Sequence, residues 1–339
     1  MSTPYADFVF GIYPGSEAGS DKGIVSGARD NPVQISRCLD DLQGGSQPFI
    51  VRAYERFSDR ENPSQWASQQ PLQYEQYLEN GRLLDLVLMF QSARGDVAAY
   101  LEFATELVKR QAPRLYSVQV TEEANSRNGP NVIDGPYPNV LNALVEGVKK
   151  VKHTLRQLGH AQVRVGFNAT PTFGPASAFW TDIGNRGGAD FLDCLDYIGL
   201  DFFPDVFRSL APDGNPGDLE ASARLVLQVM RNEWLPAAGV GHHIPIHITE
   251  HGWPTSSSRS EERQAEVIEK IVRLLWAERQ RLNIARYTLF DLRDSNSATS
   301  DRDDDLFRHF GITREDYSPK SAYRKFRSLV AEYGCLARV

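Results

Sequence analysis

The sequence has few cysteines, no excess of positive charge and no long apolar run, and each shortage excludes a class of protein. Cys38, Cys194 and Cys335 lie far apart and lack the paired spacings of a disulfide framework or a zinc site, so we expect reduced thiols. A formal net charge of -7 provides no positive surface for nucleic acid or an anionic membrane. No segment reaches about 18 uninterrupted apolar residues, the length that a transmembrane helix needs.

The N-terminus does not have the pattern expected of a leader. It begins at Met1 and shows no basic region followed by a long apolar stretch and a small-residue cleavage site, so a cytoplasmic protein is expected. With 339 residues, of which 41% are hydrophobic and 24% charged, the chain has the composition of a globular protein with a large core. No linker, low-complexity tract or short repeat divides it, which favours a single domain over residues 1–339.

Short apolar runs alternate with amphipathic stretches along the chain. The runs predict eight strands, at residues 8–12, 49–52, 84–90, 115–121, 163–167, 197–202, 244–248 and 285–290. The amphipathic stretches predict helices at 32–42, 72–80, 96–110, 140–158, a shorter one ending near 195, then 219–234, 261–282 and 320–333.

This alternation predicts an α/β protein with a parallel sheet. Eight repeats without a glycine-rich phosphate loop favour a closed (β/α)8 TIM barrel over an open doubly wound sheet. The loops after the strands are longer than those before them, notably 168–188, 204–218 and 291–318. In a barrel such loops build the active face, which is where we expect the functional residues.

One carboxylate at that face stands out. The segment HITEHGWPT (247–255) carries Glu250 from an apolar strand into a Gly-Trp-Pro turn. An unpaired buried charge is costly and has no packing use, so Glu250 is predicted to act chemically. The plainer interpretation is a strand-end carboxylate satisfied by Arg52 or by a backbone amide.

The fourth predicted strand ends in two adjacent glutamates, in VQVTEEAN (118–125). Neighbouring strand residues point to opposite faces, so only one of them is expected to face the barrel axis. Ser117, Gln119 and Thr121 share the alternation of Glu123, which makes Glu123 the inward candidate. Glu122 remains the alternative for the same role.

These segments resemble the retaining (β/α)8 glycoside hydrolases called clan A. TEEAN (121–125) is similar to the GNEPN-type end of their fourth strand, and ITEHGWP (248–254) is similar to their nucleophile strand. IVRAYERF (50–57), LDYIGLDFFP (195–204) and the ending FGITREDYSPKSAY (310–323), which resembles xylosidase and cellulase-type members, support the likeness. The resemblance implies that Glu123 is the acid/base, that Glu250 is the nucleophile and that Arg52 lies near the nucleophile.

Two positions depart from the family pattern. Glu122 stands where an asparagine that bonds a sugar 2-hydroxyl is usual, and Phe202 and Phe203 stand where the sixth strand often carries a tyrosine. The resemblance therefore indicates the superfamily without assigning an individual family.

The predicted function is retaining glycoside hydrolysis by double displacement, on oligosaccharides or small glycosides, with two carboxylates about 5 to 5.5 Å apart. The residues expected to bind the sugar are Arg52, Tyr54, Glu122, Asn125, Asn168, Asp201, His251, Trp253, Trp180 and Arg293. Trp253, Trp180 and Trp66 are placed in loops at the active face, where an aromatic ring can stack on a sugar. The sugar, its linkage and the oligomeric state do not follow from the sequence.

Two rival functions are open. One is a carbohydrate-binding barrel without catalysis, suggested by the irregular glutamate pair. The other is a metal-dependent sugar isomerase or lyase, suggested by four histidines between residues 242 and 251. Zinc pairs at positions i and i+4 need a helix, and this segment is predicted to be extended, so we expect no metal and no cofactor. The acidic segment DSNSATSDRDDD (294–305) is predicted to be a solvated rim, with calcium or a cationic sugar as alternatives.

Overall fold

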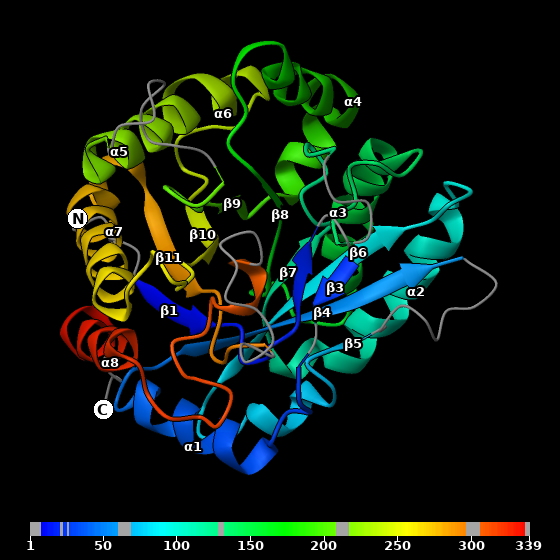
Figure 1. The fold of residues 1–339 in the computed structure, drawn as a ribbon. Helices are drawn as coiled ribbons and strands as arrows, with labels where there is room; N and C mark the ends of the chain where they lie inside the picture. Colours follow the sequence, from blue (N-terminus) through cyan, green and yellow to red (C-terminus); the bar gives the residue numbers. More distant parts are fainter. Residues whose placement is uncertain are drawn as a thin grey trace, which may run out of the picture.

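Eight parallel strands close into a barrel that helices surround (Figure 1). The computed structural model describes residues 8–20, 23–25, 27–59, 69–127, 132–207, 217–295 and 306–335. The barrel strands are β1 (Val9–Ile12), β4 (Phe49–Ser58), β6 (Leu83–Gln91), β7 (Leu115–Val120), β8 (Arg164–Ala169), β9 (Tyr197–Asp201), β10 (Ile246–His251) and β11 (Ile284–Leu289). They follow one another in chain order, and β1 pairs with both β11 and β4. The predicted (β/α)8 TIM barrel is confirmed.

Helices follow seven of the eight strands in the part of the chain that the structure describes. They are α1 (Pro32–Gln43), α2 (Val97–Gln111), α3 (Val140–Gln157), α4 (Ala178–Cys194), α5 (Leu219–Val229), which continues through a π-helical turn into α6 (Leu235–Ala237), α7 (Glu261–Leu282) and α8 (Ser321–Tyr333). The helix predicted at 72–80 is wrong. The described part of the connection between β4 and β6 holds a short strand, β5 (Gln69–Gln70), and a 3-10 turn at Tyr74–Tyr77.

Local capping explains why two of these helices begin where the sequence predicts. Asn31 precedes α1 and its side chain accepts hydrogen bonds from the N–H groups of Val33 and Gln34, while Pro32 occupies the first turn. Ser260 caps α7 in the same way through the N–H of Arg263. Each such cap stabilises a helix by about 1 kcal/mol.

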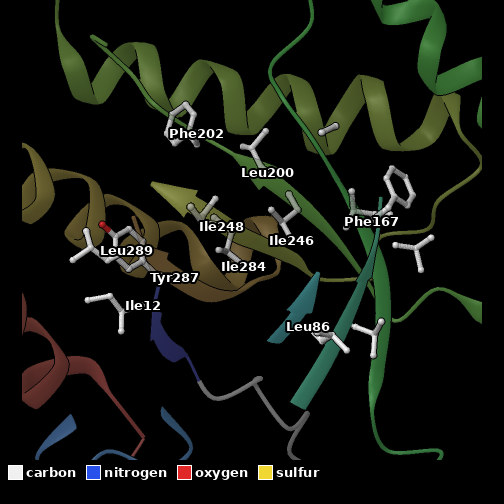
Figure 2. Packing of buried hydrophobic residues seen from close by; sticks show 14 of the residues in the cluster. Ile12, Leu86, Phe167, Leu200, Phe202, Ile246, Ile248, Ile284, Tyr287 and Leu289 are labelled. Atoms are coloured by element: carbon white, nitrogen blue, oxygen red, sulfur yellow. The ribbon is translucent and has the colours of Figure 1, made fainter. Parts of the chain in front are cut away.

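The outer face of the barrel is apolar and packs against the helices. Leu200, Ile246 and Ile248 are fully buried on neighbouring strands, and Figure 2 shows them within this packing layer. Burying each such side chain contributes about 1.5–3 kcal/mol. Because the side chains of a strand alternate, the other face of these strands is left for the barrel interior.

The barrel interior is polar and centred on Asp85 in β6. Asp85 accepts hydrogen bonds from Arg52 Nη1 at 2.7 Å, from Arg286 and from Ser117. Burial alone would raise the pKa of Asp85, but the guanidinium groups of Arg286 and Arg52 hold it well below its usual range. Arg52 is fully buried and fixed in place by this contact.

An additional antiparallel pair follows β1, formed by β2 (Ala18–Ser20) and β3 (Gly23–Val25). Among the described residues, we find no helix with the length and apolar character that crossing a membrane would require.

Candidate active site

Four carboxylates meet at the carboxyl ends of the barrel strands, and we call them the carboxylate cluster. Glu122 and Glu123 follow β7, Asp201 ends β9, and Glu250 lies near the end of β10. Oxygens of Glu122, Asp201 and Glu250 lie within 4.8 Å of one another, and Glu123 forms a hydrogen bond with Asp201. Glu123 is partly exposed, whereas the other three are buried.

A bulge in β10 turns Glu250 into the barrel. Ile246 and Ile248 pair in step with β9, but the register shifts between Ile248 and Glu250, which places Glu250 opposite Asp201. An extra residue in a strand redirects the side chains that follow it. Glu250 therefore points inward although its place in the alternation matches that of two outward-facing isoleucines.

Two side chains of β4 bind the Glu250 carboxylate. The Tyr54 hydroxyl donates a hydrogen bond to Oε1 of Glu250, and Arg52 Nη2 lies 3.3 Å from the same oxygen. Arg52 Nε also donates to the Tyr54 oxygen at 2.7 Å, so the two donors support each other. Both donors stabilise the ionised form of Glu250.

The chain leaves β7 through two residues with positive φ, Thr121 at 63° and Glu123 at 45°. Strand alternation therefore ends at Val120, and the prediction that only one of the two glutamates faces the axis is wrong. Asp134 holds this turn, since its Oδ2 accepts the N–H groups of Glu122 and Phe90, each at 2.7 Å. Both glutamates therefore reach the carboxylate cluster.

Glu122 and Glu123 differ in what their carboxylates contact. Glu122 accepts hydrogen bonds from Gln119 Nε2 at 2.6 Å, Asn168 Nδ2 at 3.1 Å and Arg52 Nη2 at 3.4 Å. The hydrogen bond that raises the pKa of the Glu123 carboxyl joins it to Asp201. Glu122 is thus fixed by three donors, whereas the carboxyl of Glu123 has another carboxyl as its neighbour.

Asp201 links the two sides of the cluster. Its Oδ1 accepts from Thr249 at 2.6 Å and its Oδ2 accepts from Asn168. Gly199 makes this approach feasible, because a Cβ there would lie 2.8 Å from side-chain atoms of both Asn168 and Thr249. Asp201 therefore stays close to both Glu123 and Glu250.

The electrostatics separate the two predicted catalytic residues. Burial and the Asp201 charge raise the pKa of Glu250 to about 7, with Arg52 and Tyr54 opposing the rise. Burial, followed by Asp201 and Glu250, raises the pKa of Glu123 well above its usual range. The two carboxyls therefore differ in what opposes the rise in pKa: Arg52 and Tyr54 bond directly to Glu250, whereas the hydrogen bond from Asp201 raises the pKa of Glu123 further.

Two groups of side chains in the described structure have the proximity that a metal ion requires. One is Glu122, Asp201 and Glu250, and the other is the mostly exposed set His153, Asp190 and Cys194. The oxygens of the first group already accept hydrogen bonds from five donors, Arg52, Tyr54, Gln119, Asn168 and Thr249. Carboxylate oxygens that already accept hydrogen bonds from N–H and O–H groups are less available to coordinate a cation, so these contacts favour a site without a metal.

The four clustered histidines do not form a metal site with one another. The His247 ring stacks on Tyr197 inside the barrel at 4.2 Å, and His242 lies 3.2 Å from the carbonyl oxygen of Arg281. Among the described residues, neither metal-like group includes any of the four. The four histidines are close together in the sequence, which suggested an isomerase or lyase, but in the fold their side chains have different surroundings.

Two predicted sugar-stacking tryptophans are buried. Trp180 was expected in a loop, but it lies in α4, is 0% exposed and stacks on Trp234 at 6.1 Å. Trp253 does follow β10, yet it is 3% exposed and Arg259 lies 4.7 Å from its ring centre. The placement of Trp180 at the active face is wrong, and in this conformation Trp253 has little surface for a sugar.

His251 and Arg293 lie outside the cluster. His251 is 0% exposed, bonds the Tyr287 hydroxyl at 2.6 Å through Nδ1, and has its pKa lowered by burial to about 3. Arg293 pairs with Asp30 at 2.9 Å and with the carbonyl of Ala28. The prediction that these two residues contact the sugar is therefore wrong. His251 packs against Tyr287, and Arg293 joins the loop after β11 to the loop after β1.

Asn125 lines a cavity that none of the four cluster carboxylates lines. Its amide nitrogen donates to the Thr170 carbonyl at 2.9 Å and its amide oxygen accepts the Thr170 N–H at 3.0 Å. The cavity has a volume of about 490 Å³ and lies between the loops that follow β7 and β8. Asn125 thus shapes the site through its backbone contacts.

Several site residues were not singled out from the sequence. Gln119 and Thr249 contact the cluster, Asp134 shapes the β7 turn, and Asp85 anchors Arg52. The inward alternation of Gln119 is the one signal that could have found such a residue. Trp66 and most of the acidic segment, residues 296–305, lie outside the described residues.

No family model matches the chain, and no curated protein sequence does. The structure is similar to a family 39 glycoside hydrolase from Bacteroides cellulosilyticus WH2, with a TM-score of 0.57 and 16% identity over 95% of this chain and 63% of that one. It is also similar to a β-glucuronidase from Ruminococcus gnavus in complex with D-glucuronic acid, with a TM-score of 0.56 and 14% identity over 96% and 49%.

An endo-1,4-β-xylanase from Penicillium canescens matches with a TM-score of 0.50 and 16% identity, over 77% of this chain and 78% of that one. The chain spans between about half and two-thirds of the length of the first two structures. All three are clan A barrels, so the resemblance predicted from TEEAN and ITEHGWP is confirmed at the level of the fold. The chain has the (β/α)8 fold of these glycoside hydrolases.

Proposed function

We propose that this chain is a single-domain retaining glycoside hydrolase in which Glu250 is the nucleophile and Glu123 is the acid/base. The observation that carries the proposal is the contrast in contacts within one cluster. Glu250 is stabilised as an anion by Arg52 and Tyr54, while the Glu123 carboxyl lies against Asp201 and holds its proton. Similar structures with glycosidase titles support the choice of reaction.

The first step would form a covalent glycosyl-enzyme. An Oε atom of Glu250 attacks the anomeric carbon while the bond from that carbon to the glycosidic oxygen breaks. Glu123 transfers its carboxyl proton to the departing oxygen, so the leaving group departs as a neutral alcohol. Arg52 and Tyr54 hold the attacking carboxylate in place.

The second step would reverse the role of Glu123. Its carboxylate takes a proton from water, whose oxygen attacks the anomeric carbon and breaks the ester bond to Glu250. Two inversions at that carbon give net retention. The two carboxylates within 4.8 Å of Glu250 are Glu122 and Asp201. For Glu123 and Glu250, the separation of about 5 to 5.5 Å that direct attack requires stays a prediction.

The sugar itself is best found by a glycoside screen that includes uronides. Arg56 lies on the same face of β4 as Arg52 and Tyr54, is 6% exposed, and its Nε and Nη1 have no hydrogen-bond partner among the described residues. A guanidinium group with free donors suits a sugar carboxylate. One of the similar structures holds D-glucuronic acid, which supports the same choice.

Trapping with 2-deoxy-2-fluoro glycosides tests the mechanism. We expect a covalent sugar on the peptide that contains Glu250, detected by mass spectrometry, and an initial product with the anomeric configuration of the substrate, detected by NMR. An initial product of inverted configuration, or full activity of Glu250→Gln, would overturn the proposal.

The metal-dependent sugar isomerase or lyase is the second candidate, because three cluster carboxylates lie within 4.8 Å of one another. A chelator would then abolish activity and zinc or manganese would restore it. Under the glycosidase proposal, a chelator leaves glycoside hydrolysis unchanged.

A further inference from the structure

We propose that His153, Asp190 and Cys194 form a zinc site that ties the end of α3 to the end of α4 and stabilises the barrel. The site is separate from the carboxylate cluster, and the proposal does not rest on the proposed function. It revises the expectation that the chain binds no metal, because that expectation considered only the four clustered histidines and the spacings between cysteines.

The three side chains come from two helices that pack against each other. Asp190 and Cys194 lie four residues apart in α4, so both project from one face of that helix. His153 lies in α3, and its ring reaches that face. The three ligand atoms all lie within 4.8 Å of one another. Zinc sites use such a pair of ligands at positions i and i+4, completed by a residue of another element.

Both side chains from α4 approach the same ring nitrogen of His153. Cys194 Sγ lies 3.7 Å from His153 Nε2, and Asp190 Oδ1 lies 3.6 Å from it. That nitrogen carries at most one hydrogen to donate, and a Cys-His-Asp triad would instead place the carboxylate at Nδ1. In a tetrahedral zinc site with bonds of about 2.0–2.3 Å, neighbouring ligand atoms lie about 3.4–3.6 Å apart. Convergence at these distances favours a shared ion over a hydrogen-bonded triad.

The three ligands differ in burial, and the difference leaves one side open to solvent. Cys194 is 0% exposed, so packing fixes its thiol, whereas the side chains of His153 and Asp190 are 47% and 62% exposed. A water molecule on the exposed side can supply the fourth ligand. The thiol proton leaves to solvent when the ion binds, and one thiolate with one carboxylate then balances the charge of Zn²⁺. A set of sulfur, nitrogen and oxygen ligands suits zinc better than magnesium or calcium.

The site lies at the end of the barrel opposite the carboxylate cluster. Cys194 is the last residue of α4 and precedes β9, so it lies near the beginning of a strand, whereas the cluster lies where the strands end. In (β/α)8 barrels the end where strands begin contributes to stability, and catalysis takes place at the other end. We therefore assign the ion a stabilising role.

Helix α4 is broken just before this site, which gives the ion something to stabilise. Gly188 has a φ of 62° and a ψ of -166°, so residues 189–194 form a separate short helical segment. A helix of this length is not stable by itself. Arg156 of α3 already contacts the segment by donating to the Asp193 carbonyl at 2.9 Å. Zinc would add a second link between α3 and this segment.

Metal titration of the full chain tests the proposal. The reduced chain is treated with a chelator, dialysed and titrated with zinc chloride or with cobalt chloride. We expect the melting temperature to rise by about 3 °C or more in excess zinc. Bound cobalt should show thiolate-to-metal charge-transfer absorption, which requires a cysteine ligand. Absence of this absorption, or a melting temperature that zinc does not raise, would overturn the inference.

Two variants and a matched control locate the ion. Cys194→Ser and His153→Ala should each lower zinc affinity at least about tenfold and abolish the rise in melting temperature. His153→Ala changes an exposed side chain, so it tests the site even where Cys194→Ser disturbs folding. Cys335→Ser is the control, because Cys335 is also a reduced thiol but contacts the Phe8 carbonyl, and this variant should keep the cobalt absorption.

Two results with these variants would overturn the assignment. One is a zinc affinity in His153→Ala equal to that of the wild type, and the other is loss of the cobalt absorption in Cys335→Ser. Glycoside hydrolysis below the melting transition should be the same with and without zinc. Failure of the zinc site would therefore leave the proposed function of the carboxylate cluster untouched.

Discussion

The ends of β10 and β7 bring carboxylates to the same place by different means. At β10, one bulge turns one glutamate inward, and two donors from β4 bind it. At β7, two left-handed residues turn two glutamates inward, and only Glu122 receives strong donors. Donors aimed at a carboxylate favour its ionised form, and carboxylates aimed at it favour its protonated form.

We infer from this difference that the neighbouring charges, more than position along the strand, would distinguish the two roles that we propose for Glu250 and Glu123. Glu250 is buried and Glu123 is partly exposed, and both lie among carboxylates. Arg52 lies directly against Glu250, but at Glu123 its effect on the pKa is smaller than those of Asp201 and Glu250. Arg52 in turn depends on Asp85 deep in the barrel. The experiments below test this comparison, in order of decreasing expected effect.

Removing the predicted nucleophile should have the largest effect. Glu250→Gln keeps the size of the side chain but cannot form the ester, so kcat should fall by at least about 10⁴-fold for every leaving group. The measurement is steady-state kinetics on glycosides with good and poor leaving groups. Glu332→Gln, at an exposed position on α8, is the control, and a loss confined to poor leaving groups would reverse the roles of the two ends.

Removing the predicted proton donor should matter only where a proton is needed. Glu123→Gln should lower kcat/KM by about 10²- to 10⁴-fold for alkyl glycosides and far less for a dinitrophenyl glycoside, whose leaving group needs no proton. Added azide should restore turnover and form a glycosyl azide. If Glu122→Gln shows this pattern and Glu123→Gln does not, Glu122 is the acid/base.

Removing one donor from Glu250 should shift the pH profile. The pKa of Glu250, raised by burial and Asp201 to about 7, sets the acid limb of kcat/KM, since activity requires its ionised form. Tyr54→Phe removes a hydrogen bond that lowers this pKa, so the acid limb should move to higher pH and kcat/KM at neutral pH should fall about tenfold or more. An acid limb that does not move in Tyr54→Phe would show that Tyr54 does not stabilise the anion.

The smallest effect concerns stability. Burial and the Asp201 charge raise the pKa of Glu122 above its usual range, so the folded protein binds this proton more tightly than the unfolded chain does. Folding stability from this group is complete below the unfolded pKa of about 4 and is lost as pH rises. Glu122→Gln should therefore gain stability relative to wild type as pH rises, by about 1 kcal/mol at neutral pH, measured by urea unfolding at several pH values. A gain that shrinks with rising pH would contradict this.

The fold could be predicted from the sequence because its signals are local and repeated. Helix α7 begins and ends where its periodicity does, at Glu261 and Leu282, and Ser260 caps it. The predicted helix at 72–80 failed for a physical reason. Gln73 near its start and Asn80 and Gly81 at its end have positive φ, so only a short run of residues between them can be helical.

The site was only partly predictable. The alternation of side chains predicts which face a residue occupies within a strand, but it does not predict the direction of residues where the strand ends. Arg52, Tyr54 and Asp201 follow the regular alternation and were placed correctly at the barrel mouth. Glu122 was expected to face outward, and the positive φ of Thr121 prevented that. Trp180 and His251 were misplaced because a sequence does not distinguish an aromatic ring that packs on a helix from one that faces a ligand.

The bulge in β10 has a further consequence for how this barrel can change. Ile246 and Ile248 pack against the outer helices, whereas Glu250 points into the barrel mouth. The register shift between Ile248 and Glu250 allows both orientations on one strand. Substitutions at position 250 then leave the packing of the two isoleucines intact, and substitutions of the isoleucines leave the carboxylate in place. Chemistry at the mouth can be redesigned on this strand without repacking the shell around it.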